Sequence, residues 1–297
     1  MKKCMLSLAL AMSLCLSALG IFAAAEYDPD HGPTAERMEV ETYRNTSMEG
    51  QLKATDPDGD ELTYTLTTEP MKGTVTVESD GSFVYTPKEN KGGKDYFGYK
   101  AADPDGNESP EATVTIRIRK QKSGVRYDDM QGDPAGKAAV WLSEQGVFTG
   151  ELVAERWHFD PSQTVTRGEF LAMAETLSET PVLQGVMTTG FGDDAAIPAW
   201  AKGYVATARM NGAVSGYSDG EKMVFAADRP ITRAECAVIL DRMLSPAPAA
   251  AVNEAVPAWA AQAVANLGNF ELYTDGDRTS EPITRAECAK LLYHAFG

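Results

Sequence analysis

The sequence contains little of three residue types whose abundance would point to particular functions. Its 297 residues include four cysteines, three histidines and only 27 Lys+Arg, against 43 Asp+Glu. So few cysteines argue against a fold held together by disulfides. The formal charge of −16 argues against nucleic acid and anionic lipid as partners, because the chain would repel both. The histidines have no metal-ligand spacing, and neither a Cys-x-x-Cys pair nor a phosphate-binding glycine loop is present.

Long apolar runs are also scarce, and the one that exists opens the chain. Lys2 and Lys3 precede an apolar stretch over residues 5–22, which ends in three alanines. A positive start, an apolar centre and a small-residue cleavage site predict a signal peptide over residues 1–25. A membrane span is the competing interpretation, because the run is near the lower length limit for one. Cleavage would remove both lysines and change the formal charge from −16 to −18, and we expect no membrane span in the rest of the chain.

The region after the signal peptide alternates apolar and polar residues in short runs, which is typical of strands with one buried face. Turn sequences such as Asp80-Gly81 and Lys91-Gly92-Gly93 separate the runs. This spacing predicts an antiparallel β-sandwich over residues 26–122, with a polar linker at its end. The alternating runs are Leu62–Leu66, Thr74–Val77, Phe83–Thr86 and Thr113–Ile118.

The motif order of this region resembles the cadherin-like, Ig-fold repeats of bacterial surface proteins. The resemblance rests on Asp56–Tyr64, Gly73-Thr74-Val75 and Asp80–Pro87. Asp56, Asp58 and Asp60 could ligate calcium, which binds several oxygens. The same Asp-Pro-Asp-Gly chemistry is typical of a turn, in which Asp caps the backbone and Gly adopts a positive φ. We favour the turn, because cadherin calcium sites usually lie between tandem repeats and this region holds one repeat.

The second half of the chain repeats itself three times. Ile231–Ala237 recurs unchanged as Ile283–Ala289, and Val165–Leu171 is a looser version. Pro198–Ala201 likewise recurs as Pro257–Ala260. Such self-similarity indicates supersecondary units that bury their apolar faces against one another. The expected units, called the first, second and third copies below, are residues 126–179, 190–245 and 253–297.

Each copy contains a Thr-Arg-x-Glu segment that predicts the start of a helix. Threonine followed three residues later by glutamate forms a capping box, in which each side chain accepts from the other residue's backbone amide. The apolar residue before the threonine should pack on the fourth helical residue. Apolar residues continue at helical spacing, so we expect mainly helical copies. The capping pairs are Thr166/Glu169, Thr232/Glu235 and Thr284/Glu287.

The arginine after each threonine is the main functional clue. Arg167, Arg233 and Arg285 would each be the first residue of a helix, where free amides and the helix dipole favour an anion. Arginine also suits bidentate binding of a carboxylate. The pattern therefore predicts three candidate carboxylate-binding grooves. Pairing of each arginine with a nearby Asp or Glu explains the pattern equally well.

Two cysteines lie outside the predicted signal peptide. Cys236 and Cys288 occupy the same position in the second and third copies, directly after the capping glutamate. A small buried apolar side chain is the expected role there. A disulfide between the copies is the alternative that the spacing leaves open.

The three copies resemble S-layer homology (SLH) domains. The second copy carries the resemblance best, through Phe191-Gly192-Asp193, Ala199-Trp200-Ala201, Gly212–Gly220 and Ile231–Glu235. The resemblance implies a pseudo-threefold helical bundle that binds secondary cell-wall polysaccharide, often through a pyruvylated sugar whose carboxylate contacts the motif arginine. The expected fold class is therefore multidomain, with an all-β Ig/cadherin-like sandwich before a mainly α-helical pseudo-threefold bundle. The candidate carbohydrate-binding residues are Arg233, Arg167, Arg285, Trp200, Asp193, Gly216 and Asp219.

The copies depart unequally from the SLH pattern. The first has Gly168 where alanine is usual, and Pro134 falls near the position of the expected tryptophan. The third has a shortened loop, with Leu272 where the second copy has glycine. We therefore expect the second copy to bind best, so that Arg233→Ala weakens wall binding more than Arg285→Ala.

Enzyme motifs are weak in this sequence. Gly216–Gly220 matches the G-x-S-x-G pattern of hydrolases, but no strong strand precedes it, and the only later histidine, His294, aligns with Arg242 on a solvated helix face. We predict a non-catalytic cell-surface protein anchored to the cell wall. A calcium-dependent adhesin, whose β module would contact other surface proteins, is the runner-up. A wall-processing enzyme is third, since a catalytic carboxylate pair could lie among the many acidic residues.

Overall fold

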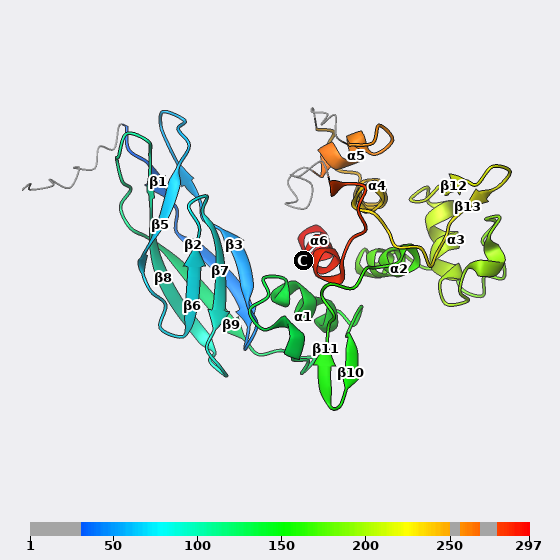
Figure 1. The fold of residues 1–297 in the computed structure, drawn as a ribbon, viewed down its shortest axis with the longest axis horizontal. Coiled ribbons are helices and arrows are strands. Elements are labelled where there is room, and N and C mark those ends of the chain that lie inside the picture. Colours follow the sequence, from blue (N-terminus) through cyan, green and yellow to red (C-terminus); the bar gives the residue numbers. More distant parts are fainter. Residues whose placement is uncertain (1–30, 250–255, 268–277) are drawn as a thin grey trace, which may run out of the picture.

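In the computed structural model a β-rich module precedes a helical half, and the two lie side by side (Figure 1). The structure describes residues 31–249, 256–267 and 278–297. The predicted signal peptide and Leu272 of the third copy lie outside these residues. Among the described helices, none is long and apolar enough to cross a membrane.

Two sheets that share one core form the β module. The strands are β1 (Thr34–Ala35), β2 (Met38–Tyr43), β3 (Met48–Gln51), β4 (Ala54–Thr55), β5 (Thr63–Thr68), β6 (Gly73–Val77), β7 (Ser82–Pro87), β8 (Gly93–Ala102) and β9 (Ala112–Arg119). One sheet has the order β2-β9-β8-β5, the other has β3-β7-β6, and β1 pairs with β4. The pairing of β2 with β9 is parallel, so the prediction of a purely antiparallel sandwich is wrong at this edge. A long connection removes the antiparallel constraint of a tight hairpin, and almost the whole module separates β2 from β9.

Alternation along the strands places one face of each sheet in the core. In β9, Val114 and Ile116 are buried, whereas Arg117 is exposed. Phe83 of β7 meets Phe97 of β8 edge to face, with ring centroids 5.3 Å apart. The four runs predicted from alternation correspond to β5, β6, β7 and β9. Strand β8 was missed because it is buried at consecutive residues and therefore lacks the two-residue period.

The helical half packs its helices across the boundaries of the sequence copies. Its elements are α1 (Gly136–Glu144), α2 (Arg167–Leu177), α3 (Lys202–Met210), α4 (Arg233–Leu244), α5 (Ala261–Asn266) and α6 (Arg285–Phe296), the hairpins β10 (Glu151–Val153)/β11 (Arg156–His158) and β12 (Tyr217–Ser218)/β13 (Met223–Val224), and the 3-10 turns η1 (Asp128–Met130) and η2 (Asp194–Ala196). Helix α2 packs on α3, α4 on α5, and α6 on α1. Each copy's second helix thus contacts the first helix of the next copy, and the third copy returns to the first.

Helices α2, α4 and α6 begin at the predicted arginines, and all three have a complete capping box. The residues before the caps form a closed ring of backbone hydrogen bonds. The amide of Val165 donates to Ile283 (3.1 Å), that of Ile283 to Ile231 (2.9 Å), and that of Ile231 to Val165 (2.9 Å). All three side chains are at most 3% exposed. The ring therefore joins the three copies at the centre of the helical core.

The β module contacts the helical half through α1 and α6. The backbone amide of Lys137 donates to the carbonyl of Ser47 (3.1 Å), and Lys290 forms an ion pair with Glu49 (2.8 Å). Tyr43, the last residue of β2, packs against the helical core. The predicted polar linker contacts the helical half, because the amides of Lys122 and Ser123 both donate to the carboxylate of Glu144 on α1.

Candidate functional site

The three motif arginines each reach across a boundary between copies. Arg167 of the first copy lies beside the second copy, where it pairs with Glu235 (3.1 Å) and donates from Nε to the carbonyl of Phe225 (3.0 Å). Its guanidinium also lies over the Phe225 ring, 5.0 Å from the centroid. Because the side chain is only 7% exposed, burial lowers the pKa of Arg167, although Glu235 opposes that effect.

Arg233 is the most enclosed of the three. Its side chain is 2% exposed and pairs with Glu287 of the third copy's capping box and with Glu281 (3.2 Å). The arginine therefore has protein carboxylates as partners, which was the alternative explanation of the motif. Neither groove described below includes Arg233.

Arg285 breaks this cyclic pattern. By analogy with the other two it should pair with Glu169, the capping glutamate of the first copy. Instead its Nη1 donates to the carbonyl of Phe159 (3.1 Å) and contacts Asp160 (3.4 Å), and its Nη2 lies 3.8 Å from Glu151. Glu169 accepts from the amide and the hydroxyl of Thr166 through one oxygen, Oε2.

The helix N-termini are less open than the sequence indicates. The amides of Arg167, Arg233 and Arg285 donate to backbone carbonyls of the neighbouring copy, at distances of 2.9, 3.1 and 2.7 Å. The next amide of each helix does the same, at 2.8, 2.8 and 3.0 Å. The expectation of free amides for an anion is therefore wrong at these positions, and any anion contact must come from side chains.

One groove lies between the first, second and third copies and has a volume of about 600 Å³. We call it the second-copy groove, because the loop of the second copy at residues 213–217 forms one wall. Gly216 and Trp259 line it. Gly216 has φ 72°, and a Cβ there would lie 2.6 Å from the Phe191 ring and the Val224 carbonyl, so only glycine fits. The polar lining is Arg167, Ser215, Tyr217, Arg229, Glu235 and Arg242.

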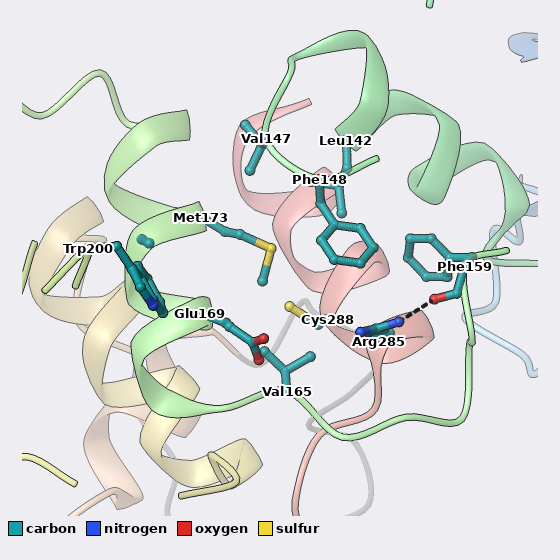
Figure 2. Close-up of a pocket in the computed structure, with 11 residues that line it drawn as sticks. Leu142, Val147, Phe148, Phe159, Val165, Glu169, Met173, Trp200, Arg285 and Cys288 are labelled. Atoms are coloured by element: carbon teal, nitrogen blue, oxygen red, sulfur yellow. Dashed lines mark hydrogen bonds between the residues drawn. The ribbon is translucent and has the colours of Figure 1, made fainter. Parts of the chain in front are cut away.

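A second groove has a volume of about 180 Å³ and lies around the equivalent loop of the first copy (Figure 2). We call it the first-copy groove. Arg285 and Glu169 are its charged residues, and Trp200 lines it in the position that Trp259 has in the other groove. Its apolar lining includes Val147, Phe148, Phe159, Met173 and Cys288. Each groove thus combines the loop of one copy, the arginine of the copy before it and the tryptophan of the copy after it.

The structure distributes the seven candidate sugar-binding residues differently from the sequence prediction. Arg167 and Gly216 line the second-copy groove, while Arg285 and Trp200 line the first-copy groove. The remaining three, Arg233, Asp193 and Asp219, line neither groove.

The two aspartates have other contacts. Asp193 accepts from the amides of Phe225 (3.0 Å) and Ala226 (2.7 Å), so it braces a loop. The amide of Asp219 donates to Lys222 (3.0 Å) in the turn of the β12–β13 hairpin. Sequence reasoning missed Trp259, Arg229 and Arg242. The repeated Pro-Ala-Trp-Ala segment could have shown Trp259 by its equivalence to Trp200.

Comparison with known proteins agrees with both parts of this architecture. The family model described as "Bacterial cadherin-like domain" matches residues 26–120, and the model described as "S-layer homology domain" matches residues 190–237. The chain carries one bacterial cadherin-like domain and an SLH domain. The SLH match covers most of the second copy, which contains the loop and the capping segment described above.

A curated relative and several solved structures are also similar to parts of the chain. The "Surface-layer 125 kDa protein" of Lysinibacillus sphaericus is 28% identical in an alignment of 154 residues that covers 48% of this chain and 13% of that protein. The chain therefore matches only about an eighth of that relative's length. The SLH domain and this relative indicate a cell-surface protein anchored to the wall.

The structural likenesses are weak. Drosophila N-cadherin EC1-4 is 18% identical, with a TM-score of 0.24 over 30% of this chain and 25% of the other. The SrpA adhesin of Streptococcus sanguinis is 17% identical, with a TM-score of 0.25 over 34% and 64%. An endo-fucoidan hydrolase of glycoside hydrolase family 107 is 20% identical, with a TM-score of 0.27 over 36% and 16%. Scores this low support no inference about fold or chemistry.

The acidic loop of the cadherin-like domain has the hydrogen bonds of a turn. Oδ1 of Asp56 accepts from the amides of Asp58 (2.9 Å) and Asp60 (3.3 Å), and Gly59 has φ 80°. Desolvation by its neighbours and the nearby carboxylates raise the pKa of Asp60, which is exposed. Across the described part of the chain, no three His, Cys, Asp or Glu side chains are grouped to hold a metal ion. Calcium binding stays a prediction, which calcium titration of the whole chain would test.

The hydrolase-like motif lies on the β12–β13 hairpin of the SLH domain. Ser218 ends a two-residue strand, and a turn follows it rather than a helix. The geometry of a nucleophile elbow requires a helix there, so the turn interpretation is correct.

Cys236 and Cys288 are both free and buried, as expected of small apolar side chains. Burial raises the pKa of both thiols, which makes them poor nucleophiles.

Proposed function

We propose that the protein is a non-catalytic surface protein whose helical half binds secondary cell-wall polysaccharide through an anionic, pyruvylated sugar in the second-copy groove. The observation that carries this proposal is the charge of that groove. Arg167, Arg229 and Arg242 line it with the single carboxylate Glu235, a balance of 3 − 1 = +2 in a chain with a formal charge of −16. A carboxylate on a neutral sugar chain would be attracted locally although the whole protein is acidic.

The side chains suggest how a sugar would be held. Arg242 is exposed and makes one long hydrogen bond, to the carbonyl of Ala213 (3.4 Å), so its guanidinium is available to a ligand. Arg229 pairs with Glu235 and lies over Tyr217 at 5.4 Å. Trp259 is 62% exposed and offers a flat apolar face to a sugar ring. Arg167, which is enclosed by Glu235 and Phe225, positions the wall of the groove.

We further propose that the three copies form one pseudo-threefold bundle, with the copy boundaries at 126–179, 190–245 and 253–297. Support comes from the cyclic order of helix packing, from the ring at Val165, Ile231 and Ile283, and from the equivalent composition of the two grooves. In this arrangement a groove needs parts of all three copies, so one copy alone would bind no glycan. The cadherin-like domain would be the part that is displayed.

Sedimentation with purified cell walls tests the function. The protein should pellet with native walls and stay in solution with walls stripped of pyruvylated polysaccharide. Arg242→Ala should reduce the affinity about tenfold or more, since a hydrogen bond to a charged group contributes about 1.5–3 kcal/mol. Arg156→Ala is the matched control, because this arginine is exposed on β11 outside both grooves. Equal pelleting of the two variants, or equal pelleting with stripped walls, would contradict the proposal.

A further inference from the structure

Asp193 lines neither groove, but it holds the loop at residues 225–229 in an unusual conformation. Its carboxylate accepts from two successive backbone amides, through Oδ1 from that of Phe225 (3.0 Å) and through Oδ2 from that of Ala226 (2.7 Å). Ala226 has φ 54°, which lies in the left-handed region that residues other than glycine rarely adopt. The two hydrogen bonds therefore stabilise a backbone conformation that alanine by itself disfavours.

This loop fixes the arginine that reaches it from the first copy. The carbonyl of Phe225 accepts from Nε of Arg167 (3.0 Å). Farther along the loop, the carbonyl of Ala227 accepts from the amide of Gly168 (2.8 Å). The carbonyl of Arg229 accepts from the amide of Arg167 (2.9 Å). The loop therefore sets both the first turn of α2 and the direction of the Arg167 guanidinium.

The same loop carries a second guanidinium of the second-copy groove. The amide of Arg229 donates to the carbonyl of Ala226 (3.2 Å). The Arg229 side chain pairs with Glu235 and lies over the Tyr217 ring, 5.4 Å from its centroid. A change in the φ of Ala226 would therefore move both Arg167 and Arg229, which are two of the three arginines that line this groove.

The first copy has the same arrangement at equivalent positions. Asp129 accepts from the amides of Phe159 (2.9 Å) and Asp160 (2.7 Å), and Asp160 has φ 55°. The carbonyl of Phe159 in turn accepts from Nη1 of Arg285 (3.1 Å), a bond that Figure 2 shows as a dashed line. Both grooves thus have an aspartate that holds the loop on which a groove-lining arginine rests.

The sequence of the third copy lacks this aspartate. Five residues before the repeated Pro-Ala-Trp-Ala segment, where the second copy has Asp193, the third copy has Val252, which lies outside the described residues. The arginine that reaches the third copy is the enclosed Arg233, whose guanidinium pairs with Glu281 and Glu287. The aspartate is therefore present in the two copies whose loops meet a groove-lining arginine, and absent from the copy that receives Arg233.

We propose that Asp193 is a positioning residue for the second-copy groove, which acts through the loop at residues 225–229 and does not touch the ligand. This inference rests on the proposed function, in which that groove binds an anionic wall sugar. A carboxylate is required, because both of its oxygens accept, whereas an asparagine would turn its NH2 group toward one of the two amides. If the loop kept its conformation in only about a tenth of the molecules, the apparent affinity would fall about tenfold.

Sedimentation with native cell walls measures the effect on binding. Asp193→Asn should weaken the affinity about tenfold. Adding Ala226→Gly should return it to within about threefold of the wild type, because glycine adopts a positive φ without a side-chain clash. Asp228→Asn is the matched control, since this aspartate is exposed on the same loop and does not line the groove.

Arginine side-chain NMR of the protein without ligand measures the positioning itself. The Nε–H of Arg167, assigned through Arg167→Lys, should exchange with water at least about tenfold faster in Asp193→Asn, because its acceptor on Phe225 is no longer fixed. Asp129→Asn, the same change at the equivalent position of the first copy, should leave this rate unchanged. Urea unfolding shows whether each variant is folded.

Three results would overturn the inference: an unchanged Arg167 exchange rate in Asp193→Asn, equal weakening of wall binding by Asp228→Asn, or a failure of Ala226→Gly to restore what Asp193→Asn loses, folding included. Wall binding with an unchanged affinity in Asp193→Asn would refute this inference and leave the proposed function standing. The exchange measurement needs no glycan, so faster exchange in a protein that never pellets with walls would refute the proposed function alone.

Discussion

The same arginine, at the same helical position in three copies, has three different environments. Arg167 lines a groove while it is paired with Glu235. Arg233 is buried and pairs with Glu281 and Glu287. Arg285 donates to the carbonyl of Phe159 in the first copy. The motif alone could not distinguish these, because the partners belong to neighbouring copies. The expected ranking of Arg233 as the best ligand contact has no support in the geometry, since its side chain is 2% exposed.

Arg233→Ala should act on stability before it acts on binding. Removing one partner of a buried ion pair costs about 3 kcal/mol at the low end of the usual range, because the other charge stays behind. Urea unfolding followed by circular dichroism measures the loss. Arg278→Ala is the comparison, since this arginine also pairs with Glu281 but is half exposed, and it should cost less than about 1 kcal/mol. Equal losses would show that the burial of Arg233 does not matter.

Glu175 on α2 should make stability depend on pH. It is 1% exposed, and its Oε2 is buried without a hydrogen-bond partner. Burial raises its pKa from 4.5 to about 8. Because the folded state holds this proton more tightly than the unfolded state, the contribution is most favourable below pH 4.5 and is lost as pH rises to about 8.

Glu175→Gln should remove that dependence. Each pKa unit corresponds to 1.36 kcal/mol, so a rise from 4.5 to about 8 should make the variant more stable than the wild type by up to about 5 kcal/mol at pH 9 and little different at pH 4. Thermal unfolding across this pH range measures both chains. A wild-type curve that stays parallel to the variant's from pH 4 to 9 would contradict a buried, protonated Glu175.

At the scale of the elements, local sequence signals predicted where the helices begin, but they did not predict which residues meet in each groove. The three capping boxes fixed the starts of α2, α4 and α6 because the cap and its glutamate are only three residues apart. Residues were assigned to the wrong groove because the sequence defines each copy by chain order. Packing instead pairs α2 with α3, α4 with α5 and α6 with α1, so Arg167 and Arg285 each line a groove beside the loop of the next copy.

The capping threonines should contribute similar amounts in all three copies. Thr232→Ala removes the acceptor for the amide of Glu235 and should destabilise the protein by about 1 kcal/mol. Thr232→Ser keeps the hydroxyl and should cost much less. Chemical denaturation compares the two variants, and an equal loss in both would assign the effect to the threonine methyl group rather than to the cap.

At the scale of the whole molecule, the cadherin-like domain contacts the helical half through α1, α6 and the segment that joins the two parts. The sequence predicts a linker at residues 120–124 because this segment is polar. In the structure, Gln121 donates to the carbonyl of Arg44 (2.7 Å), and the amides of Lys122 and Ser123 share the carboxylate of Glu144. Sequence composition predicts solvent exposure, but it does not show the acceptor that holds such a segment.

Glu144→Ala should release this segment. Limited trypsin digestion should then cut after Lys120 or Lys122 several times faster than in the wild type, since protease sensitivity follows local opening. Glu221→Ala, at an exposed residue of the β12–β13 hairpin, serves as the control. An unchanged rate in Glu144→Ala would mean that the two hydrogen bonds do not restrain the linker.

The ring of Val165, Ile231 and Ile283 also sets an order of assembly. While the chain is being made, the first two copies can form one of the three ring bonds, from Ile231 to Val165. The other two bonds, and the partner that α1 finds in α6, require residues 283–296. The core of the cadherin-like domain contains none of these residues. A growing chain can therefore complete the core of the domain that we propose is displayed before the ring of the helical half, which we propose binds the wall, is able to close.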